Sequence, residues 1–291
     1  RPSDNPLIVH IGKVQEMEPL VRRIPDAAKK LMEAFWPGPL TMILPKTPKV
    51  PSITTGGLDT VAIRMPAHPV ASRLLEICDF PIAAPSANRS GRPSPTTACH
   101  VYEDMEGRIP LILDGGKSEV GVESTVVDMT RSRPVILRPG GITYEMLEKI
   151  LGDIEVDPSV LKPVMEGQKV RSPGMKYTHY SPSAKVIIVS GELDPMVQKI
   201  SRMYDQYEGE GKKTAILATR ETMDHYAGKR VKLVGSRREP GTIAARLFAC
   251  FRELDEEGVD IILAEAIPTE DMGLAVMNRM ARAAGFCIEQ A

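Results

Sequence analysis

The chain has 291 residues, of which 42% are hydrophobic and 26% charged, and its formal net charge is -1 at pH 7. This length exceeds the usual size of a single domain, so two domains are the starting expectation. A near-neutral charge means that a nucleic acid would have to be held by local patches, and the sequence has neither a signal-peptide pattern nor an apolar run long enough to cross a membrane. We therefore expect a cytoplasmic protein without a membrane partner.

Cysteine and histidine are too dispersed to predict a metal site. Cys78, Cys99, Cys250 and Cys287 form no CxxC pair, and the histidines form no HExxH motif. This spacing argues against a zinc site or a disulfide framework and fits buried apolar thiols in a reducing compartment. No metal ligand is therefore predicted among the protein side chains.

The first half of the chain predicts short strands with few crossover helices, which is typical of a mixed sheet. Strands are expected at 6–11, 40–44, 61–65, 80–84, 111–113, 125–129 and 135–137. A helical stripe predicts a helix at 26–35, ended by the Pro and Gly residues of 36–39, and a second helix is expected near 70–77. We expect a twisted mixed sheet curled around a central cavity.

Residues 83–98, AAPSANRSGRPSPTTA, are typical of an anion-binding loop. Arg89 and Arg92 lie among hydroxyl and amide side chains with no carboxylate to neutralise them, and the loop joins a strand end to a helix start at Thr96 and Thr97. Backbone N–H groups at such a helix start favour phosphate. The alternative is a solvated turn rich in Ser, Gly and Pro.

Two later strand ends carry further polar groups. Ser124 opens the strand at 125–129, and Arg138 closes the strand at 135–137, where open α/β sheets place ligands. The run RSRPVILR (131–138) has three arginines and no acid, which indicates either a patch for a polyanion or a solvated face. Ser124 could instead cap a turn, and Arg138 could form a surface ion pair with Glu123 or Asp128.

After residue 155 the pattern changes twice. Prolines and glycines over 155–183 predict a linker that cannot be buried core, and its segment SPGMKYTHYSP is either a plain tether or a lid. Strands at 184–190, 213–219, 230–236 and 259–267 then alternate with helices at 194–207, 242–256 and 273–285. This alternation predicts a small parallel sheet with helices on both faces, a Rossmann-like arrangement, although no GxGxxG follows its first strand.

Several segments occur in the order found in one known family. They are RPSDNPLIVHI (1–11), WPGPLT (36–41), TVAIRMP (60–66), PSAN (85–88), ESTVVD (123–128), LRPG (137–140), SPGMKYTHYSP (172–182) and GLAVMNRMARAA (273–284). On these segments the chain resembles the YrdC/Sua5 family of L-threonylcarbamoyladenylate synthases from end to end. The resemblance implies an α/β protein with a YrdC-like catalytic domain at 1–154, a linker or lid at 155–183 and a smaller Rossmann-like α/β/α domain at 184–291. Family members carry a further N-terminal segment, so we expect an N-terminally incomplete copy.

The resemblance also implies a reaction. L-threonine and bicarbonate or CO2 give N-carboxythreonine, whose carbamate attacks the α-phosphorus of ATP and expels pyrophosphate, with Mg²⁺ on the nucleotide. Because the substrate supplies the nucleophile, the protein must position two anions and stabilise the charge on the phosphoryl oxygens. The product serves the modification of adenosine 37 in tRNA, which implies a downstream threonylcarbamoyl transferase complex as a partner and allows tRNA contact.

Carried onto matching positions, the resemblance assigns site residues. The catalytic residues are Arg1, Ser124 and Arg138. The expected ATP contacts are Arg1, Asn5, Thr60, Ser86, Asn88, Ser94, Arg138, Lys176, His179 and Tyr180. The expected threonine and carbamate contacts are His10, Arg64, the backbone of Ala84, and Ser124. Arg64 suits a bidentate clamp on the threonine carboxylate. Without the resemblance, His10 could be a satisfied strand histidine.

Two other functions compete with the synthase. A double-stranded RNA or tRNA-binding module would need clusters of Lys and Arg, and the near-neutral charge and an aromatic content of 4% disfavour it. A carbamoyl-transfer protein of hydrogenase maturation shares the expected fold of the first domain, but it would bring acylphosphatase and zinc-finger segments that this sequence lacks.

Overall fold

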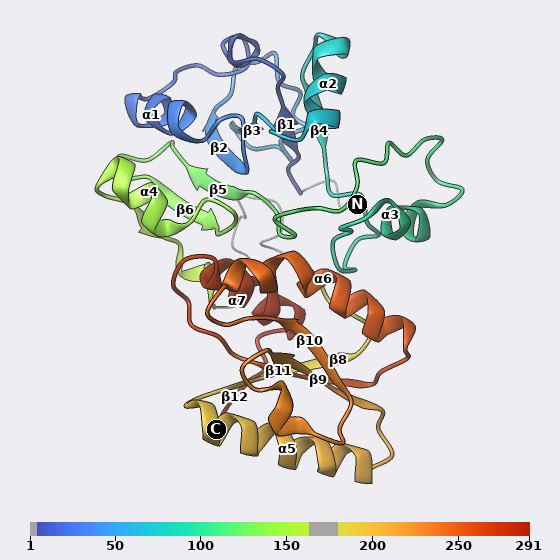
Figure 1. Ribbon diagram of the computed structural model, residues 1–291. Coiled ribbons are helices and arrows are strands. Elements are labelled where there is room, and N and C mark those ends of the chain that lie inside the picture. Colours follow the sequence, from blue (N-terminus) through green and yellow to red (C-terminus); the bar gives the residue numbers. More distant parts are fainter. Residues whose placement is uncertain (1–4, 163–179) are drawn as a thin grey trace. The chain divides into compact units, whose positions relative to one another are not determined.

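The computed structural model describes residues 5–162 and 180–291, which form two compact units, each built around its own sheet (Figure 1). The first unit contains the described residues of 1–87, 97–116 and 123–177, and the second contains those of 88–96, 117–122 and 178–291. The units therefore do not follow chain order, since two short segments from the first half of the chain pack with the C-terminal residues.

The first unit has a seven-stranded mixed sheet in the order β4-β1-β3-β2-β5-β6-β7. Its strands are β1 (Ile8–His10), β2 (Leu40–Pro45), β3 (Thr60–Arg64), β4 (Ile82–Ala84), β5 (Thr125–Asp128), β6 (Val135–Arg138) and β7 (Glu155–Val156). Parallel and antiparallel pairs alternate across it, which confirms the predicted mixed sheet.

One predicted strand of the first unit is wrong. Residues 111–113 form no strand, and the side chains of Leu111 and Leu113 are exposed. A three-residue apolar run becomes a strand only when a neighbouring strand takes its backbone hydrogen bonds.

Helices cover one face of the first sheet. The unit contains α1 (Asp26–Phe35), α2 (Pro69–Cys78), α3 (Ala98–Met105) and α4 (Tyr144–Leu151), with short 3-10 turns at Val14–Met17 and Pro158–Val160. Leu31 of α1 and Leu147 of α4 share a core with Met42 and Ile63 of the sheet. Since strand side chains alternate between faces, their sequence neighbours Thr41 and Arg64 lie on the opposite face.

The second unit has a five-stranded sheet in the order β10-β9-β11-β8-β12, and all of its pairs are parallel. Its elements are β8 (Lys185–Ser190), α5 (Leu193–Gly209), β9 (Thr214–Thr219), η3 (Met223–Tyr226), β10 (Val231–Gly235), α6 (Pro240–Glu256), β11 (Ile261–Glu265), α7 (Gly273–Ala283) and β12 (Ile288–Gln290). The Rossmann-like expectation is confirmed.

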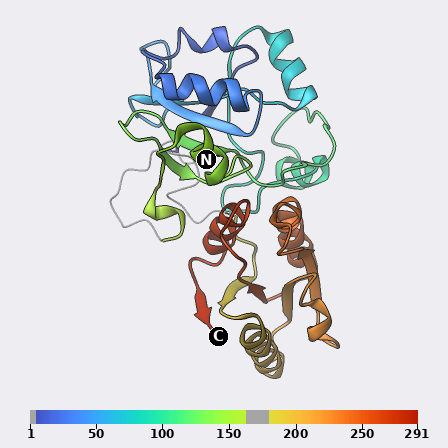
Figure 2. The same cartoon turned by 60° about the vertical axis from the view of Figure 1, so that its left-hand side comes forward.

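Both faces of this second sheet are covered, as Figures 1 and 2 show, with α5 on one face and α6 and α7 on the other. Val186 and Ile188 of β8 pack with α6 and α7, whereas Ile187 and Val189 pack with α5. A strand buried on both faces is apolar at every position, which explains why the sequence shows a continuous run here.

Two expectations about burial need correction. Tyr180, in the segment expected to stay outside any core, is only 6% exposed and stacks on Phe248 of α6 with ring centroids 5.2 Å apart. The aromatic ring outweighs the polar composition of its neighbours, because burying it removes a large apolar surface from water. Among the cysteines only Cys250 is buried, whereas Cys99 is exposed.

In the described part of the chain, no helix is long and apolar enough to cross a membrane.

Candidate active site

Polar side chains gather on the face of the first sheet that α1 and α4 leave uncovered. His10 of β1 lies beside Arg64 of β3 in a parallel pair, and Thr41 of β2 lies opposite Arg64 in an antiparallel pair. Ser124, directly before β5, contacts Thr41 through their hydroxyl oxygens at 2.7 Å. The register of four strands thus places an imidazole, a guanidinium and two hydroxyls on one face.

The turn after α1 braces Arg64. Trp36 donates its indole N–H to the carbonyl of Leu40 at 2.8 Å, and the backbone N–H of Gly38 donates to Met65 at 2.8 Å. The carbonyl of Gly38 in turn accepts the Nε–H of Arg64 at 3.1 Å. A hydrogen bond at Nε fixes the plane of the guanidinium and leaves its terminal nitrogens as a fork, the geometry that binds a carboxylate in bidentate fashion.

The loop after β6 holds Ser124 in place. Arg138 donates from Nε to the carbonyl of Ser124 at 3.0 Å and from Nη2 to its hydroxyl at 3.1 Å. Gly140 passes so close that an added Cβ would lie 2.4 Å from the carbonyl oxygen of Glu123, so only glycine fits. The expected alternative of a surface ion pair for Arg138 is wrong, because Arg138 is only 6% exposed.

The charges of Arg64 and Arg138 act on their neighbours in this row. Burial, and then the nearby charge of Arg138, lower the pKa of Arg64 to about 10. In the described part of the chain Arg64 forms no ion pair, and its one hydrogen bond goes to a carbonyl. Burial, and then the charge of Arg64, lower the pKa of His10 to about 4, so its imidazole is neutral at pH 7. A bound anion would relieve the repulsion between the two guanidiniums.

Sequence reasoning missed Thr41 as a member of this row. Thr41 is fully buried, yet its hydroxyl bonds that of Ser124. Its signal was a hydroxyl side chain at the end of WPGPLT, one of the segments that carry the family resemblance.

The remaining predicted site residues lie in several places. Asn5, Thr60 and Ala84 are half-buried in the first unit and Ser86 is exposed there, whereas Asn88 and Ser94 are buried in the second unit. Tyr180 lies in the core of the second unit. Arg1, Lys176 and His179 are outside the described residues, so their predicted roles stay predictions.

The stretch at 83–98 forms a closed turn that leads to a helix. The amide of Asn88 donates to the carbonyls of Arg89 and Arg92, both at 2.9 Å, and Thr97 caps α3 by accepting the N–H of His100. The charge of Arg92 acts on Asp255 of α6, which lies far outside this stretch in sequence. A tertiary contact across so much sequence cannot be seen in the local run.

Of the two interpretations of 131–138, the ion pairs favour the solvated face over the polyanion patch. Arg131 lies 3.5 Å from Asp128, and Arg133 pairs with Asp153 at 2.8 Å and with Glu155 at 2.5 Å. The two exposed arginines are therefore neutralised by carboxylates, all three of which lie outside the run.

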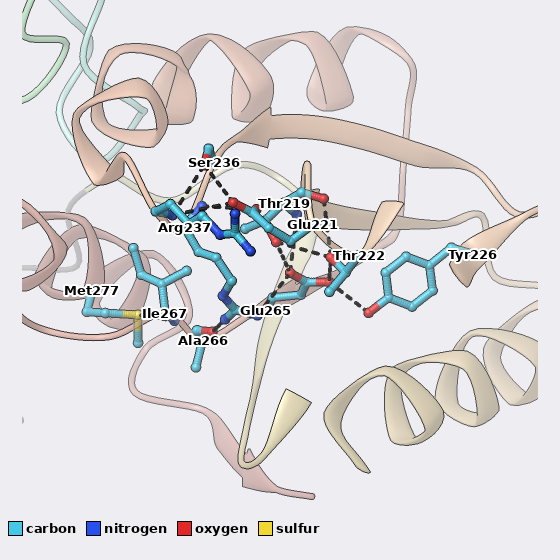
Figure 3. Close-up of polar contacts among 11 residues, drawn as sticks. Thr219, Glu221, Thr222, Tyr226, Ser236, Arg237, Glu265, Ala266, Ile267 and Met277 are labelled. Atoms are coloured by element: carbon cyan, nitrogen blue, oxygen red, sulfur yellow. Dashed lines mark hydrogen bonds and ion pairs between the residues drawn. The ribbon is translucent and has the colours of Figure 1, made fainter. Parts of the chain in front are cut away.

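The second unit contains a contrasting polar cluster at the carboxyl ends of β9 and β11 (Figure 3). Glu265, only 2% exposed, accepts the N–H and the hydroxyl of Thr219, the hydroxyl of Thr222 and the phenol of Tyr226. Arg237 lies 4.0 Å from the same carboxylate. This edge of a parallel sheet is where ligands commonly bind, and here the protein's own side chains fill it.

Potential metal ligands do not gather in the described residues. No group of three or more His, Cys, Asp or Glu side chains in that part of the chain could hold a metal ion. The row from His10 to Arg138 instead offers cationic and hydroxyl groups, which suit anionic substrates and phosphate oxygens.

Fold and site together define a two-unit α/β protein whose first sheet carries a row of cationic and hydroxyl side chains. Residues 1–140 match the family model described as telomere recombination (Sua5/YciO/YrdC), and residues 142–285 match that of the C-terminal domain of threonylcarbamoyl-AMP synthase. The chain therefore belongs to the Sua5/YrdC family.

Relatives match over nearly the whole chain. The threonylcarbamoyl-AMP synthases of Pyrococcus abyssi and Bacillus subtilis are each 48% identical, over 99% and 98% of this chain and 82% and 81% of their own lengths. A crystal structure of P. abyssi Sua5 complexed with L-threonine superposes with a TM-score of 0.94 at 47% identity, covering all of this chain and 83% of that one. The fold expected from the sequence is thus confirmed by a solved relative.

Proposed function

We infer that the chain is an L-threonylcarbamoyladenylate synthase, a nucleotidyltransferase of tRNA modification whose substrate is L-threonine. The observation that carries this assignment is the charge of Arg64, which is half-buried near a second guanidinium, braced at Nε and without an ion pair in the described residues. Such a fork is stabilised by a bound carboxylate, and threonine supplies one. The relatives that match this chain carry the same activity in their names.

In this proposal, one side of the row binds threonine and the other side binds the phosphates of ATP. Arg64 clamps the threonine carboxylate, and the neutral imidazole of His10 accepts a hydrogen bond from the threonine amine or hydroxyl. Ser124, held by Thr41 and Arg138, contacts the carbamate. Arg138 stabilises the negative charge that develops on the α-phosphoryl oxygens, which makes it the link between the two sides.

The reaction needs no nucleophile from the protein. The threonine amine adds to CO2, or to bicarbonate with loss of water, and forms a carbamate. A carbamate oxygen then bonds to the α-phosphorus of ATP while the bond to the bridging oxygen breaks, so pyrophosphate leaves with that electron pair. Mg²⁺ would arrive on the phosphates and neutralise their charge, in keeping with a row of hydroxyl and cationic side chains.

Several expectations remain predictions. ATP and bicarbonate as substrates, Mg²⁺, the downstream transferase complex and the cytoplasmic location follow from the resemblance. The arginine run at 131–138 gives little support for direct tRNA contact, because Arg131 and Arg133 are paired with carboxylates. For the same reason the RNA-binding module is not favoured as an alternative function.

The test is incubation of the full-length protein with ATP, Mg²⁺, bicarbonate and one amino acid at a time, reading pyrophosphate release and threonylcarbamoyl-AMP by mass spectrometry. Release should require both threonine and bicarbonate. Serine should be roughly 5- to 150-fold poorer, since loss of one methyl group costs about 1–3 kcal/mol of binding. Equal turnover with glycine or lysine would contradict the assignment.

A further inference from the structure

Two buried hydroxyl groups meet on the first sheet, and together they carry one proton more than their mutual contact uses. Thr41 of β2 and Ser124, directly before β5, lie with their hydroxyl oxygens 2.7 Å apart, so one of them donates to the other. Thr41 is fully buried, and Ser124 is only 3% exposed. Each hydroxyl has one proton, so the second proton of the pair needs an acceptor elsewhere.

Arg138 limits what the hydroxyl of Ser124 can accept. Its Nη2 donates to that hydroxyl at 3.1 Å, and its Nε donates to the carbonyl of Ser124 at 3.0 Å. A guanidinium has donors only, so one lone pair of the Ser124 hydroxyl oxygen is occupied. If Thr41 also donates to this oxygen, both lone pairs are occupied, and Ser124 can only donate its own proton.

Burial decides the direction of the bond between the two hydroxyls. In the reverse direction Ser124 would donate to Thr41, and the proton of Thr41 would be left over. Among the described residues the hydroxyl of Thr41 has no other hydrogen-bond partner, and its side chain has no access to solvent. A buried donor without an acceptor is strongly unfavourable. Thr41 therefore donates to Ser124, and Ser124 keeps a proton that it can offer to the oxygen of a ligand.

Ser124 lies in the same row as the guanidinium that is assigned to threonine. Thr41 pairs with Arg64 across β2 and β3, and the charge of Arg138, which bonds Ser124, adds to burial in lowering the pKa of Arg64. These four residues all belong to the first unit. A hydroxyl donor near two cations suits an anionic oxygen, and it opposes an ammonium group, whose N–H groups need acceptors.

We propose that Thr41 is a positioning residue for the carbamate, which holds the Ser124 hydroxyl as a hydrogen-bond donor to a carbamate oxygen of N-carboxythreonine. The proposal rests on the proposed function, in which Ser124 contacts the carbamate. It adds a basis for selection, because the carboxylated amine of threonine offers the acceptor that Ser124 needs, whereas the free ammonium offers only donors. Thr41 acts only through Ser124, and its loss would let the Ser124 hydroxyl accept as well as donate.

The experiment compares Thr41→Val and Thr41→Ser with wild type in the full-length protein. It measures the Kd of L-threonine by calorimetry with and without bicarbonate, and KM for bicarbonate and for ATP. Bicarbonate should tighten threonine binding in wild type. Thr41→Val keeps the shape of the side chain and removes the donor, so it should weaken this tightening and raise KM for bicarbonate about fivefold. KM for ATP should stay within about twofold, and Thr41→Ser, which keeps the donor, should stay near wild type.

Thr47→Val is the matched control, because Thr47 follows the other end of β2 and its hydroxyl bonds the carbonyl of Pro19. In a Ser124→Ala background, Thr41→Val should change KM for bicarbonate by less than about twofold, since its effect passes through Ser124.

Thr41→Ala replaces Thr41→Val where the latter does not fold. A folded variant without the Thr41 hydroxyl but with wild-type KM for bicarbonate, or an effect that persists in full beside Ser124→Ala, would overturn the proposal. Failure of wild type to make threonylcarbamoyl-AMP would instead overturn the assigned reaction, and the calorimetric comparison, which needs no ATP, would still test Thr41.

Discussion

Each unit contains a buried polar cluster at strand ends, and the two clusters differ in how their charge is balanced. In the second unit, Glu265 receives four hydrogen bonds and the charge of Arg237 from the protein itself. In the first unit, Arg64 is half-buried near Arg138, and its side chain bonds only a carbonyl among the described residues. The carboxylate of the second unit is balanced by the protein's own side chains, whereas Arg64 of the first unit has no ion pair among the described residues.

This difference shows that position in a sheet is a weaker guide to function than charge balance. The rule that ligands bind at the carboxyl ends of parallel strands points to β9 and β11, yet that edge is filled by the protein's own side chains (Figure 3). The row of His10, Thr41, Arg64, Ser124 and Arg138 lies in a mixed sheet, to which the rule for parallel strands does not directly apply. Its mark is Arg64, a cation that forms no ion pair in the described part of the chain.

The largest expected effect is on the stability of the second unit. Glu265→Gln should lower the free energy of unfolding by about 3–5 kcal/mol, because the amide nitrogen would face hydroxyl and N–H donors and leave Arg237 without its buried counter-charge. Urea unfolding followed by circular dichroism measures this loss. Glu256→Gln, at an exposed position on α6, is the control and should change stability by less than about 0.5 kcal/mol. A small effect of Glu265→Gln would mean that the cluster does not stabilise the second unit.

The next effect concerns catalysis in the first unit. Arg64→Ala should raise KM for threonine by tenfold to a hundredfold, since a charge-assisted contact is worth roughly 1.5–3 kcal/mol. Arg138→Ala should mainly weaken ATP and also lower kcat, because Arg138 holds Ser124. Steady-state kinetics with threonine and ATP varied in turn distinguishes the effect on threonine from the effect on ATP.

Arg73→Ala serves as the control for both variants, because this exposed arginine pairs only with Glu76 on the surface. If Arg64→Ala and Arg138→Ala perturbed the same substrate alone, the division of the row into two sides would be wrong. That outcome would also remove the charge-balance argument that separates the two units.

Much of the fold was predictable because local patterns agree with tertiary contacts. The stripe of 26–35 gave α1 at the same bounds, and β8, β9, β10 and β11 each match an apolar run to within two residues at either end. Helix α4 was missed, although Thr143 before an apolar stripe is a recognisable cap, and Thr143 does accept the N–H of Met146. Strand β12 has only three residues and forms by pairing with β8, so no local pattern reveals it.

The row of polar side chains on the first sheet was predictable only in part. Arg64, Ser124 and Arg138 carried a family signal, but the contact between Thr41 and Ser124 depends on the register of β2 beside β5. The lowered pKa of His10 requires burial and the charge of Arg64, neither of which is visible in the sequence. The contact of Arg252 with the carbonyl of Pro93 joins residues too far apart for any local pattern.

A smaller effect is the pH dependence that His10 gives to the first unit. Its folded pKa of about 4 lies below the ordinary value of 6.5, so the unfolded state binds more protons between these values. Stability should therefore be full above pH 6.5 and fall as the pH drops toward 4, by about 1–2 kcal/mol between pH 7 and pH 5. His10→Gln should remove this part of the slope in urea unfolding. Arg64→Met should raise the pKa of His10 in an NMR titration, whereas an unchanged value would show that the two charges do not interact.

The smallest expected effect is the contribution of Glu221, in the second unit, to the free energy of unfolding. Partial burial alone would raise the pKa of Glu221, but hydrogen bonds from the hydroxyl of Ser236 and the backbone N–H groups of Arg237 and Arg238 lower it to about 2. A lowered carboxylate pKa contributes stability above the unfolded value of 4.5, and that contribution is lost as the pH falls through the folded value. Because Glu221 is only partly buried, Glu221→Gln should cost less than about 1 kcal/mol at pH 7 and almost nothing near pH 2. Urea unfolding of both proteins at several pH values measures the difference. A loss as large as that of Glu265→Gln would mean that a half-buried carboxylate stabilises this edge as strongly as the fully buried one, and burial would then not distinguish the structural cluster from its surroundings.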